Sequence, residues 1–110
     1  APSGALEIGR LQIYPDQRKT YMDGKPVELT PKEFELLLFL SRNRGKVLSR
    51  EELLVQVWDY HFLNGTRIVD VHISHLRDKI ERNPRSPEYI ITVRNIGYKL
   101  TSPAQQEALA

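Results

Sequence analysis

Residues 66–81, TRIVDVHISHLRDKIE, combine side-chain types and spacing that suit contact with nucleic acid. At about 100° per residue, four apolar side chains fall on one narrow stripe of a helix: Val69, Ile73, Leu76 and Ile80. The opposite side is mostly polar and charged, and consists of Arg67, Asp70, Val71, Ser74, His75, Arg77 and Asp78. One face can therefore pack on a protein core while the other offers hydrogen bonds and positive charge to the major groove of DNA.

The net charge of the chain is small but unevenly distributed. The 110 residues include 16 Lys and Arg against 14 Asp and Glu, a formal net charge of +2. Residues 66–99 hold seven basic and four acidic residues, which gives +3, and the remaining nine basic and ten acidic residues give −1. The positive charge accompanies the predicted helix and the segment after it, as expected for a domain with an anionic partner.

Several classes of function are disfavoured by what the sequence lacks. There is no cysteine, so neither a disulfide framework nor a thiolate zinc site is expected. The longest apolar block, residues 36–40, is far shorter than the roughly 18 residues of a membrane span, and the first residues lack the basic and apolar regions of a signal peptide. We therefore expect a cytoplasmic protein without membrane contact. His72 and His75 could suggest a metal pair, but no acidic cluster aligns with them, so we expect neither metal nor cofactor. No nucleophile motif or phosphate-binding glycine loop points to an enzyme.

The first thirty residues predict an antiparallel sheet of three or four strands. Leu6 and Ile8, and then Leu11 and Ile13, alternate with polar neighbours, which is the period of a half-buried strand. Asp23-Gly24 predicts a two-residue hairpin loop, because both residues tolerate positive φ. Pro26 suits an edge strand or a strand start, since it has no N–H to donate.

Two helices follow, and the residues at their starts predict them strongly. Thr30 can cap the first helix, with Pro31 at its first position and Glu33 completing a capping box. We expect this helix to run to about Arg44 and to end at Gly45, and its apolar residues to make it the most buried helix. Residues 48–53 repeat the pattern for a second, short helix that ends near residues 57–58.

The third helix and a hairpin complete the expected fold. Thr66 is the expected cap of the third helix, which ends at Asn83-Pro84 and whose DNA-contacting part we place at residues 66–82. Residues 90–100 alternate as a hairpin with its bend at Arg94-Asn95, and we expect Gly97 to serve the turn. The order predicts an α+β winged helix-turn-helix with an N-terminal antiparallel sheet. We divide the chain into a linker or cloning remnant (1–5), the domain (6–101) and a C-terminal tail (102–110).

At this level of detail the chain resembles the DNA-binding, or effector, domain of the OmpR/PhoB family of bacterial two-component response regulators. The resemblance covers residues 6–100 and rests on five segments in the family's order and spacing: LTPKEFELLLFL, VLSREELL, VW, TRIVDVHISHLRDKIE and ITVRNIGYKL. It implies sequence-specific binding of double-stranded DNA, regulation of transcription, and a receiver domain elsewhere in the full-length protein.

The resemblance and the chemistry of the side chains together suggest how DNA is contacted. The third helix would lie in the major groove, with Arg67 at a phosphate or guanine edge, Val71 at a thymine methyl group, and Arg77 at a phosphate. Arg94 would enter an adjacent minor groove. The remaining expected contacts are His72, Ser74, His75, Lys79, Thr92, Tyr98 and Trp58. The family often has arginines where this chain has Ser74 and His75, which should weaken backbone affinity and change base preference.

Some of these residues have a structural role as the alternative to a DNA contact. Trp58 and Tyr98 could be core aromatic residues, and Tyr98 could have a buried ring and an exposed hydroxyl. His72 could pack beside the apolar stripe instead of facing a phosphate. Asp70 could favour the helix dipole or pair with an arginine.

The expected partners extend beyond a single duplex. The loop after the second helix matches the family segment thought to meet RNA polymerase, although a purely structural loop is the alternative: Asp59, Tyr60, His61, Phe62, Leu63 and Asn64. We expect a monomer in isolation and a tandem pair on direct repeats. The alternative function is a winged-helix protein–protein interaction module, which would present more large apolar residues than Val71 on the outer face of its third helix.

Overall fold

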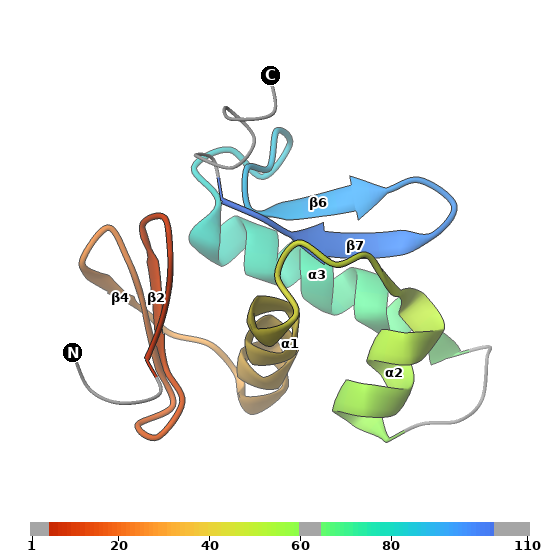
Figure 1. The fold of residues 1–110 in the computed structure, drawn as a ribbon, viewed down its shortest axis with the longest axis horizontal. Helices are drawn as coiled ribbons and strands as arrows, with labels where there is room; N and C mark the ends of the chain where they lie inside the picture. Colours follow the sequence, from red (N-terminus) through yellow and green to blue (C-terminus); the bar gives the residue numbers. More distant parts are fainter. Residues whose placement is uncertain (1–4, 60–64, 103–110) are drawn as a thin grey trace.

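The computed structural model describes residues 5–59 and 65–102, and their order of elements confirms the predicted α+β winged-helix architecture. The elements are β1 (Leu6–Ile8), β2 (Leu11–Tyr14), β3 (Lys19–Met22), β4 (Lys25–Val27), α1 (Pro31–Arg42), β5 (Leu48–Ser49), α2 (Arg50–Trp58), α3 (Arg67–Ile80), β6 (Ile90–Val93) and β7 (Gly97–Leu100). β1 to β4 lie at one end of the molecule, α1 crosses its middle, and α2 and the β6–β7 hairpin occupy the other end (Figure 1).

The N-terminal sheet is a meander in the order β1-β2-β3-β4, with every pair antiparallel. Leu11 and Ile13 of β2 are fully buried, as their alternation predicts. Asp23 and Gly24 have φ of 55° and 77°, which confirms the predicted two-residue loop with positive φ at both positions. Pro26 lies in the edge strand β4, where its missing N–H costs no ladder hydrogen bond.

α1 begins with the predicted capping box. The Thr30 side chain accepts from the Glu33 backbone N–H, and the Glu33 carboxylate accepts from the Thr30 N–H at 3.0 Å. The helix ends at Arg42, two residues earlier than expected, because Asn43 closes its last turn with backbone bonds to residues 39–41. Gly45 has the expected positive φ of 84° and donates to the Leu100 carbonyl oxygen, which ties this loop to β7.

β5 comprises only two residues and was not predicted from the sequence. It pairs with β7, so the hairpin is part of a three-stranded sheet in the order β5-β7-β6. The expected role of Gly97 in the turn is wrong. Asn95 supplies the positive φ of 67° at the bend, whereas Gly97 lies in β7, where an added Cβ would lie 2.0 Å from the Leu48 carbonyl oxygen. Gly97 is required because β5 approaches the hairpin closely.

α3 buries the predicted stripe, since Val69, Ile73, Leu76 and Ile80 are each at most 3% exposed. The helix is shorter than the predicted 66–82, because Glu81 leaves the helical conformation and turns the chain toward β6. Thr66 precedes the helix but does not cap it through its side chain, because its backbone is already helical, with φ −64° and ψ −20°. The cap expected there is therefore wrong.

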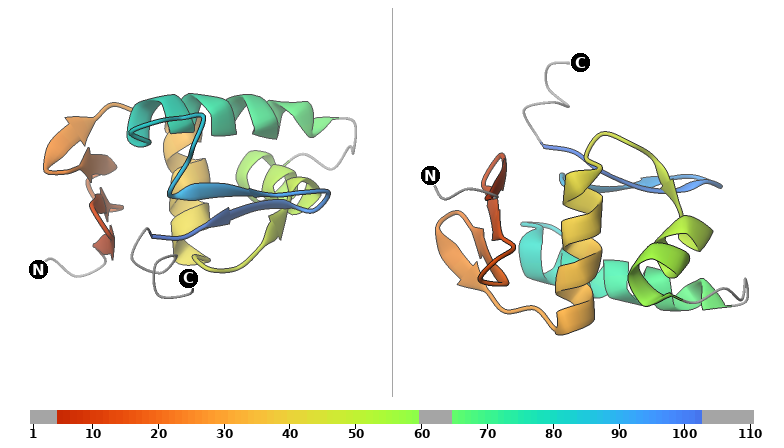
Figure 2. Two further views of the ribbon diagram at one scale, coloured as in Figure 1. Left: turned by 90° about the horizontal axis from the view of Figure 1, so that it is seen from above. Right: turned by 60° about the horizontal axis from the view of Figure 1, so that its bottom comes forward.

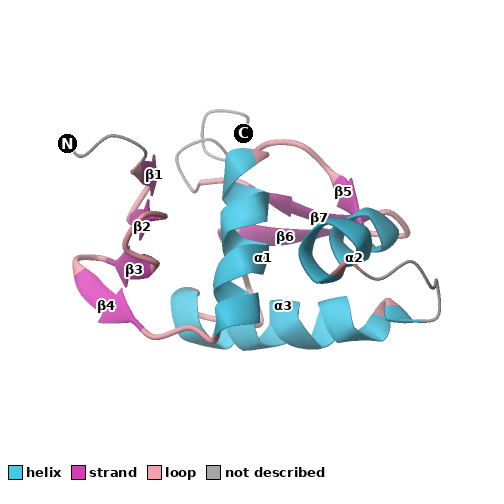
Figure 3. Ribbon diagram, turned by 90° about the horizontal axis from the view of Figure 1, so that it is seen from below, coloured by secondary structure: helices cyan, strands magenta, loops and turns pink. Residues whose placement is uncertain are grey.

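The helices, the hairpin and the N-terminal sheet all contribute side chains to one core. α3 passes beneath α1 and α2 in Figure 3, and the hairpin lies on the other side of α1 from the N-terminal sheet. The two further views show the hairpin bend and the start of α3 at the same end of the molecule, away from the N-terminal sheet (Figure 2). Within residues 5–59 and 65–102, no helix has the length and apolar character needed to cross a bilayer.

Candidate nucleic-acid interface

The outward face of α3 is open to solvent along most of its length. Val71 is 43% exposed, and Arg67, Ser74 and His75 are also exposed. Arg67 makes no side-chain hydrogen bond or ion pair with another residue of the described ranges. The first two turns of α3 therefore expose one cation, the apolar side chains of Ile68 and Val71, and the small polar Ser74.

Arg77 joins α3 to the hairpin. Its Nε and Nη2 donate to the Ile90 carbonyl oxygen at 3.2 and 2.9 Å, and Nη2 donates to Thr92 Oγ1 at 2.7 Å. The guanidinium also lies over the Tyr98 ring, 5.6 Å from its centroid. The structure thus brings together three of the expected contact residues. Because Thr92 Oγ1 accepts from Arg77, its own hydroxyl hydrogen is left to donate to another group.

A second polar contact joins the hairpin to α2 and α3. The Tyr98 hydroxyl donates to Asp70 Oδ1 at 2.6 Å, and Arg50 Nε lies 3.1 Å from the same oxygen. The expected pairing of Asp70 with an arginine is confirmed, with Arg50 of α2 as the partner. Burial raises the pKa of Tyr98, and the hydrogen bond to Asp70 and its negative charge raise it further. The Tyr98 ring is buried, in keeping with the expected core role.

Trp58 and the two histidines of α3 form a row of rings. The Trp58 and His72 rings meet edge to face with centroids 4.9 Å apart, and the His72 and His75 centroids are 6.2 Å apart. His72 Nδ1 lies 2.9 Å from the Ile68 carbonyl oxygen. A carbonyl oxygen only accepts, so Nδ1 of the His72 ring bears the hydrogen. His72 is half-buried and packs beside the core, which agrees with packing as the alternative to a phosphate contact.

A buried carboxylate lies behind the distal part of this face. The Glu33 side chain is 4% exposed and pairs with Lys79 Nζ through Oε1, while His75 Nδ1 lies 3.6 Å from its Oε2. Burial raises the pKa of Glu33, but the hydrogen bonds from Lys79 and Thr30 and the positive charge of Lys79 outweigh burial and lower it. Lys79 therefore faces an internal anion as well as solvent.

The hairpin bend offers a second exposed region. Arg94 and Asn95 are exposed, and Ile96 is 57% exposed. The bend is closed by a hydrogen bond from the Ile96 N–H to the Val93 carbonyl oxygen. Of the expected polymerase-contacting loop only Asp59 belongs to the described residues, and Tyr60 to Asn64 lie outside them.

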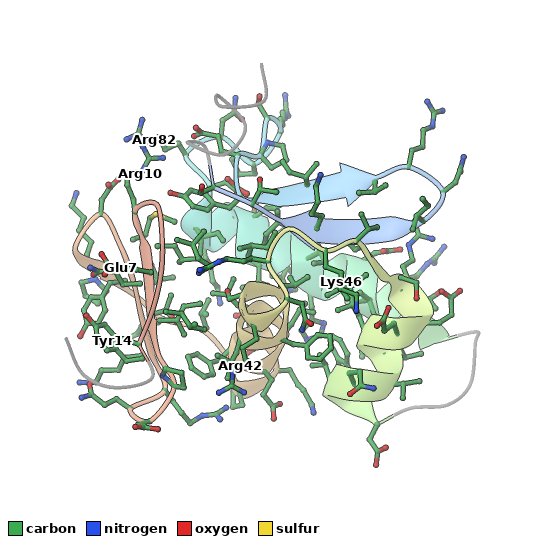
Figure 4. The ribbon with its side chains drawn as sticks, viewed as in Figure 1. Glu7, Arg10, Tyr14, Arg42, Lys46 and Arg82 are labelled. Atoms are coloured by element: carbon green, nitrogen blue, oxygen red, sulfur yellow. The ribbon has the colours of Figure 1, made fainter. Side chains whose placement is uncertain are left out.

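Part of the basic segment belongs to a different contact. Arg82 and Arg10 lie beside each other at the top of the N-terminal sheet (Figure 4), and both approach Asp23, at 3.8 and 3.4 Å. Arg82 therefore joins the end of α3 to the N-terminal sheet. Its charge counts toward the +3 of residues 66–99 but lies away from the hairpin bend.

Sequence reasoning missed two residues of this face. Arg50 and Glu33 lie on α2 and α1, and the only signals in the sequence are their places in helix-start motifs, which indicate capping and not proximity to α3. No group of His, Asp and Glu within the described ranges is arranged to hold a metal ion.

Comparison with known proteins bears on this arrangement. Residues 24–100 match the family model described as "Transcriptional regulatory protein, C terminal". The chain is 57% identical over 104 residues to the alkaline phosphatase synthesis transcriptional regulatory protein PhoP of Bacillus subtilis (strain 168), covering 94% of this chain and 43% of that protein. It is 41% identical over 102 residues to the DNA-binding response regulator MtrA of Mycolicibacterium smegmatis (strain ATCC 700084 / mc(2)155), covering 93% and 45%. The chain thus spans less than half the length of these curated relatives.

Solved structures of similar fold also belong to response regulators or their DNA-binding domains. The response regulator DrrB of Thermotoga maritima, an OmpR/PhoB homologue, superimposes with a TM-score of 0.82 at 39% identity, covering 90% of this chain and 45% of that one. The RstA DNA-binding domain of Klebsiella pneumoniae, solved in complex with the RstA box, gives 0.83 at 34% identity, covering 89% and 97%. The matched family consists of transcriptional regulators and not of enzymes. The chain belongs to the C-terminal transcriptional regulatory domain family, the winged-helix DNA-binding domain of OmpR/PhoB response regulators.

Proposed function

We propose that this chain regulates transcription by binding double-stranded DNA sequence-specifically, with α3 in the major groove and the β6–β7 hairpin at the adjacent minor groove. One observation supports this more than any other. α3 buries its apolar stripe completely, while the opposite face exposes Arg67, which has no ion pair within the described residues, together with Val71 and Ser74. The hairpin bend lies at the same end of the molecule, so both elements can meet one duplex (Figure 2).

The exposed residues divide into base-reading and phosphate-binding groups. Arg67 can make a bidentate contact to guanine or bind a phosphate, and Val71 can contact a thymine methyl group. Ser74 and His75 occupy the next outward turn. Arg94 suits a narrow minor groove, whose negative potential favours an arginine.

The residues joined to one another fit a positioning role on the phosphate backbone. Thr92 can donate its hydroxyl hydrogen to a phosphate while its oxygen accepts from Arg77, and Arg77 can offer Nη1, which takes no part in its bonds to Ile90 and Thr92. Lys79 adds charge at the far end of α3, although Glu33 partly neutralises it. His72 and Trp58 lie at the edge of the face, and the Tyr98 hydroxyl reaches a phosphate only by giving up or sharing its bond to Asp70.

The partners of the full-length protein are proposed from the relatives. MtrA is named a DNA-binding response regulator, and this chain matches less than half of it, so a receiver domain is expected in the remainder. We propose a monomer in isolation that pairs in tandem on direct repeats in the cytoplasm, and contact with RNA polymerase through residues 59–64. Static light scattering of the isolated chain tests the first point, since a stable dimer without DNA would contradict it.

The function is tested by selection of bound duplexes from a random library, followed by affinity measurements on the enriched sequence. Enrichment of direct repeats about one helical turn apart supports the proposal. Arg67→Ala should lose roughly 1–3 kcal/mol of binding free energy. Arg42→Ala is the matched control, because Arg42 is an exposed helical arginine that extends from α1 at the side of the molecule opposite the hairpin (Figure 4). Absence of any enriched sequence would favour the protein-interaction module.

A further inference from the structure

On the outward face of α3, the exposed imidazole of His75 lies next to the buried carboxylate of Glu33. We propose that His75 is a proton-dependent phosphate contact, so that DNA binding by this chain is coupled to the uptake of one proton at His75. The inference rests on the proposed function, because the phosphate is that of the bound duplex.

The geometry puts His75 between an internal anion and solvent. Its side chain is 54% exposed on the outward face of α3, and its Nδ1 lies 3.6 Å from Oε2 of Glu33, whose side chain is 4% exposed. Glu33 is fixed, since it also closes the capping box of α1 and pairs with Lys79. The imidazole of His75 therefore has a carboxylate on its inner side and solvent, where a phosphate of a duplex could lie, on its outer side.

The other charges around His75 have both signs. Lys79 of α3 binds the other oxygen of Glu33 and opposes a second cation nearby, as does any charge on His72, whose ring centroid lies 6.2 Å away. Asp78 lies one turn further along the exposed side of α3. From α2, the residue that reaches this row is the uncharged Trp58. A phosphate of a bound duplex would add a second negative charge, on the solvent side of the ring.

The hydrogen-bonding groups of the ring are a second reason why a phosphate contact requires a protonated His75. In the neutral ring, the nitrogen that faces the carboxylate bears the hydrogen, so Nε2 on the other side presents a lone pair. A phosphate oxygen only accepts, and it is repelled by that lone pair. Protonation converts Nε2 into a charged donor that can bind the phosphate, while Nδ1–H still faces Glu33. Both anions therefore favour the same charged ring.

His72 supplies a matched control on the same helix. Its Nδ1 already donates to the Ile68 carbonyl oxygen, and its ring packs against Trp58. His72→Gln should therefore leave the proton coupling in place. His61, the third histidine of the chain, is replaced in the same way so that all three are compared.

The experiment measures fluorescence anisotropy of a labelled random-sequence duplex between about pH 6 and pH 8, for wild type, His75→Gln, His72→Gln, His61→Gln and Glu33→Gln. Gln at position 33 retains a capping box but removes the charge. The affinity of wild type should fall about three- to tenfold over this range, and its salt slope at low pH should exceed that at high pH by about one. Both changes should vanish in His75→Gln, persist in His72→Gln and His61→Gln, and move to lower pH in Glu33→Gln.

A merely structural role of His75 would not change the salt slope with pH. The proposal is overturned if wild-type affinity is independent of pH, if His75→Gln keeps the pH dependence, or if Glu33→Gln leaves its midpoint unchanged. Circular dichroism at each pH verifies that every variant is folded. A chain that binds no duplex at any pH contradicts the proposed function, whereas pH-independent binding contradicts only the present inference.

Discussion

The Tyr98 hydroxyl donates a 2.6 Å hydrogen bond to Asp70 Oδ1 and joins β7 directly to α3. Arg50 approaches the same oxygen from α2, so one carboxylate connects three elements. Arg77 makes the second connection, from α3 to β6. The orientation of the hairpin relative to α3, on which simultaneous contact with two grooves depends, is therefore fixed by side-chain hydrogen bonds in addition to apolar packing.

Replacing Tyr98 with Phe tests this connection. Tyr98→Phe keeps the buried ring but removes the donor to Asp70, and should lower the free energy of unfolding by about 1 kcal/mol. Urea denaturation measures the loss. Tyr14→Phe is the control, because Tyr14 lies on the N-terminal sheet, and its hydroxyl makes no hydrogen bond with another described residue (Figure 4). Equal losses in the two variants would show that the Asp70 bond does not stabilise the fold.

The same tyrosine should make stability depend on alkaline pH. Burial, with the hydrogen bond to Asp70, raises the pKa of Tyr98 above its ordinary value of 10.0. The folded state thus prefers the protonated phenol. Its contribution is complete below the unfolded pKa and is lost as the pH rises through the higher folded pKa. Stability measured across that window should fall in wild type, and should fall less in Tyr98→Phe.

Glu81 should be a major determinant of the chain path into the hairpin. It is 7% exposed, and its carboxylate accepts from the backbone N–H groups of Glu88, Tyr89 and Ile90 at 2.8, 3.1 and 2.9 Å. Glu81→Ala leaves these donors without an acceptor and should cost roughly 2–4 kcal/mol of unfolding free energy. Glu7→Ala, at an exposed position of β1, should cost almost nothing in the same denaturation experiment. A small effect at Glu81 would mean that water replaces the carboxylate.

Gly97 should tolerate no side chain. A Cβ there would lie 2.0 Å from the Leu48 carbonyl oxygen, so Gly97→Ala must separate β5 from β7 and should cost about 3 kcal/mol or more. Gly45→Ala is the matched control. Gly45 has a φ of 84° but open space around it, and the strain of that backbone should cost only about 1 kcal/mol. Thermal melts should show a larger fall of the melting temperature in Gly97→Ala than in Gly45→Ala. The reverse order would contradict the close approach of β5 to β7.

Glu33 should make stability depend on acidic pH. Its pKa is lowered in the folded state from the ordinary 4.5, because the contacts with Lys79 and Thr30 outweigh burial. The contribution of a lowered carboxyl pKa is present above the unfolded value and is lost as the pH falls through the folded value. Acid titration of stability should show a smaller loss in Glu33→Gln than in wild type. Glu35→Gln, which alters an exposed carboxylate on the same helix, should behave like wild type.

Except for β5, the sequence alone determined the order of the elements, and for β2 and α3 it also determined the buried side. The 3.6-residue period identified Val69, Ile73, Leu76 and Ile80 as the inner face of α3, and residue chemistry at helix and turn starts predicted the capping box of α1 and the Asp23-Gly24 loop. These features depend on residues no more than four positions apart, so their physical causes are present in the local sequence.

Tertiary structure decided what depends on distant partners. Gly97 was expected in the turn because a glycine near a bend usually supplies the positive φ that the bend requires. Gly97 is instead required because the backbone of Leu48, 49 positions earlier in the chain, lies against it. The two-residue β5 has too little sequence to show any period. Arg77 looks in sequence like any exposed arginine of a helix, and only the folded chain places the Ile90 carbonyl oxygen and Thr92 within its reach. Likewise, Glu33 was predicted as a helix cap, and only the packing of α1 on α3 brings that buried charge to His75. Periodicity and capping encode which face of an element is buried, whereas the partners on either face are set by chain packing between residues that no local pattern relates.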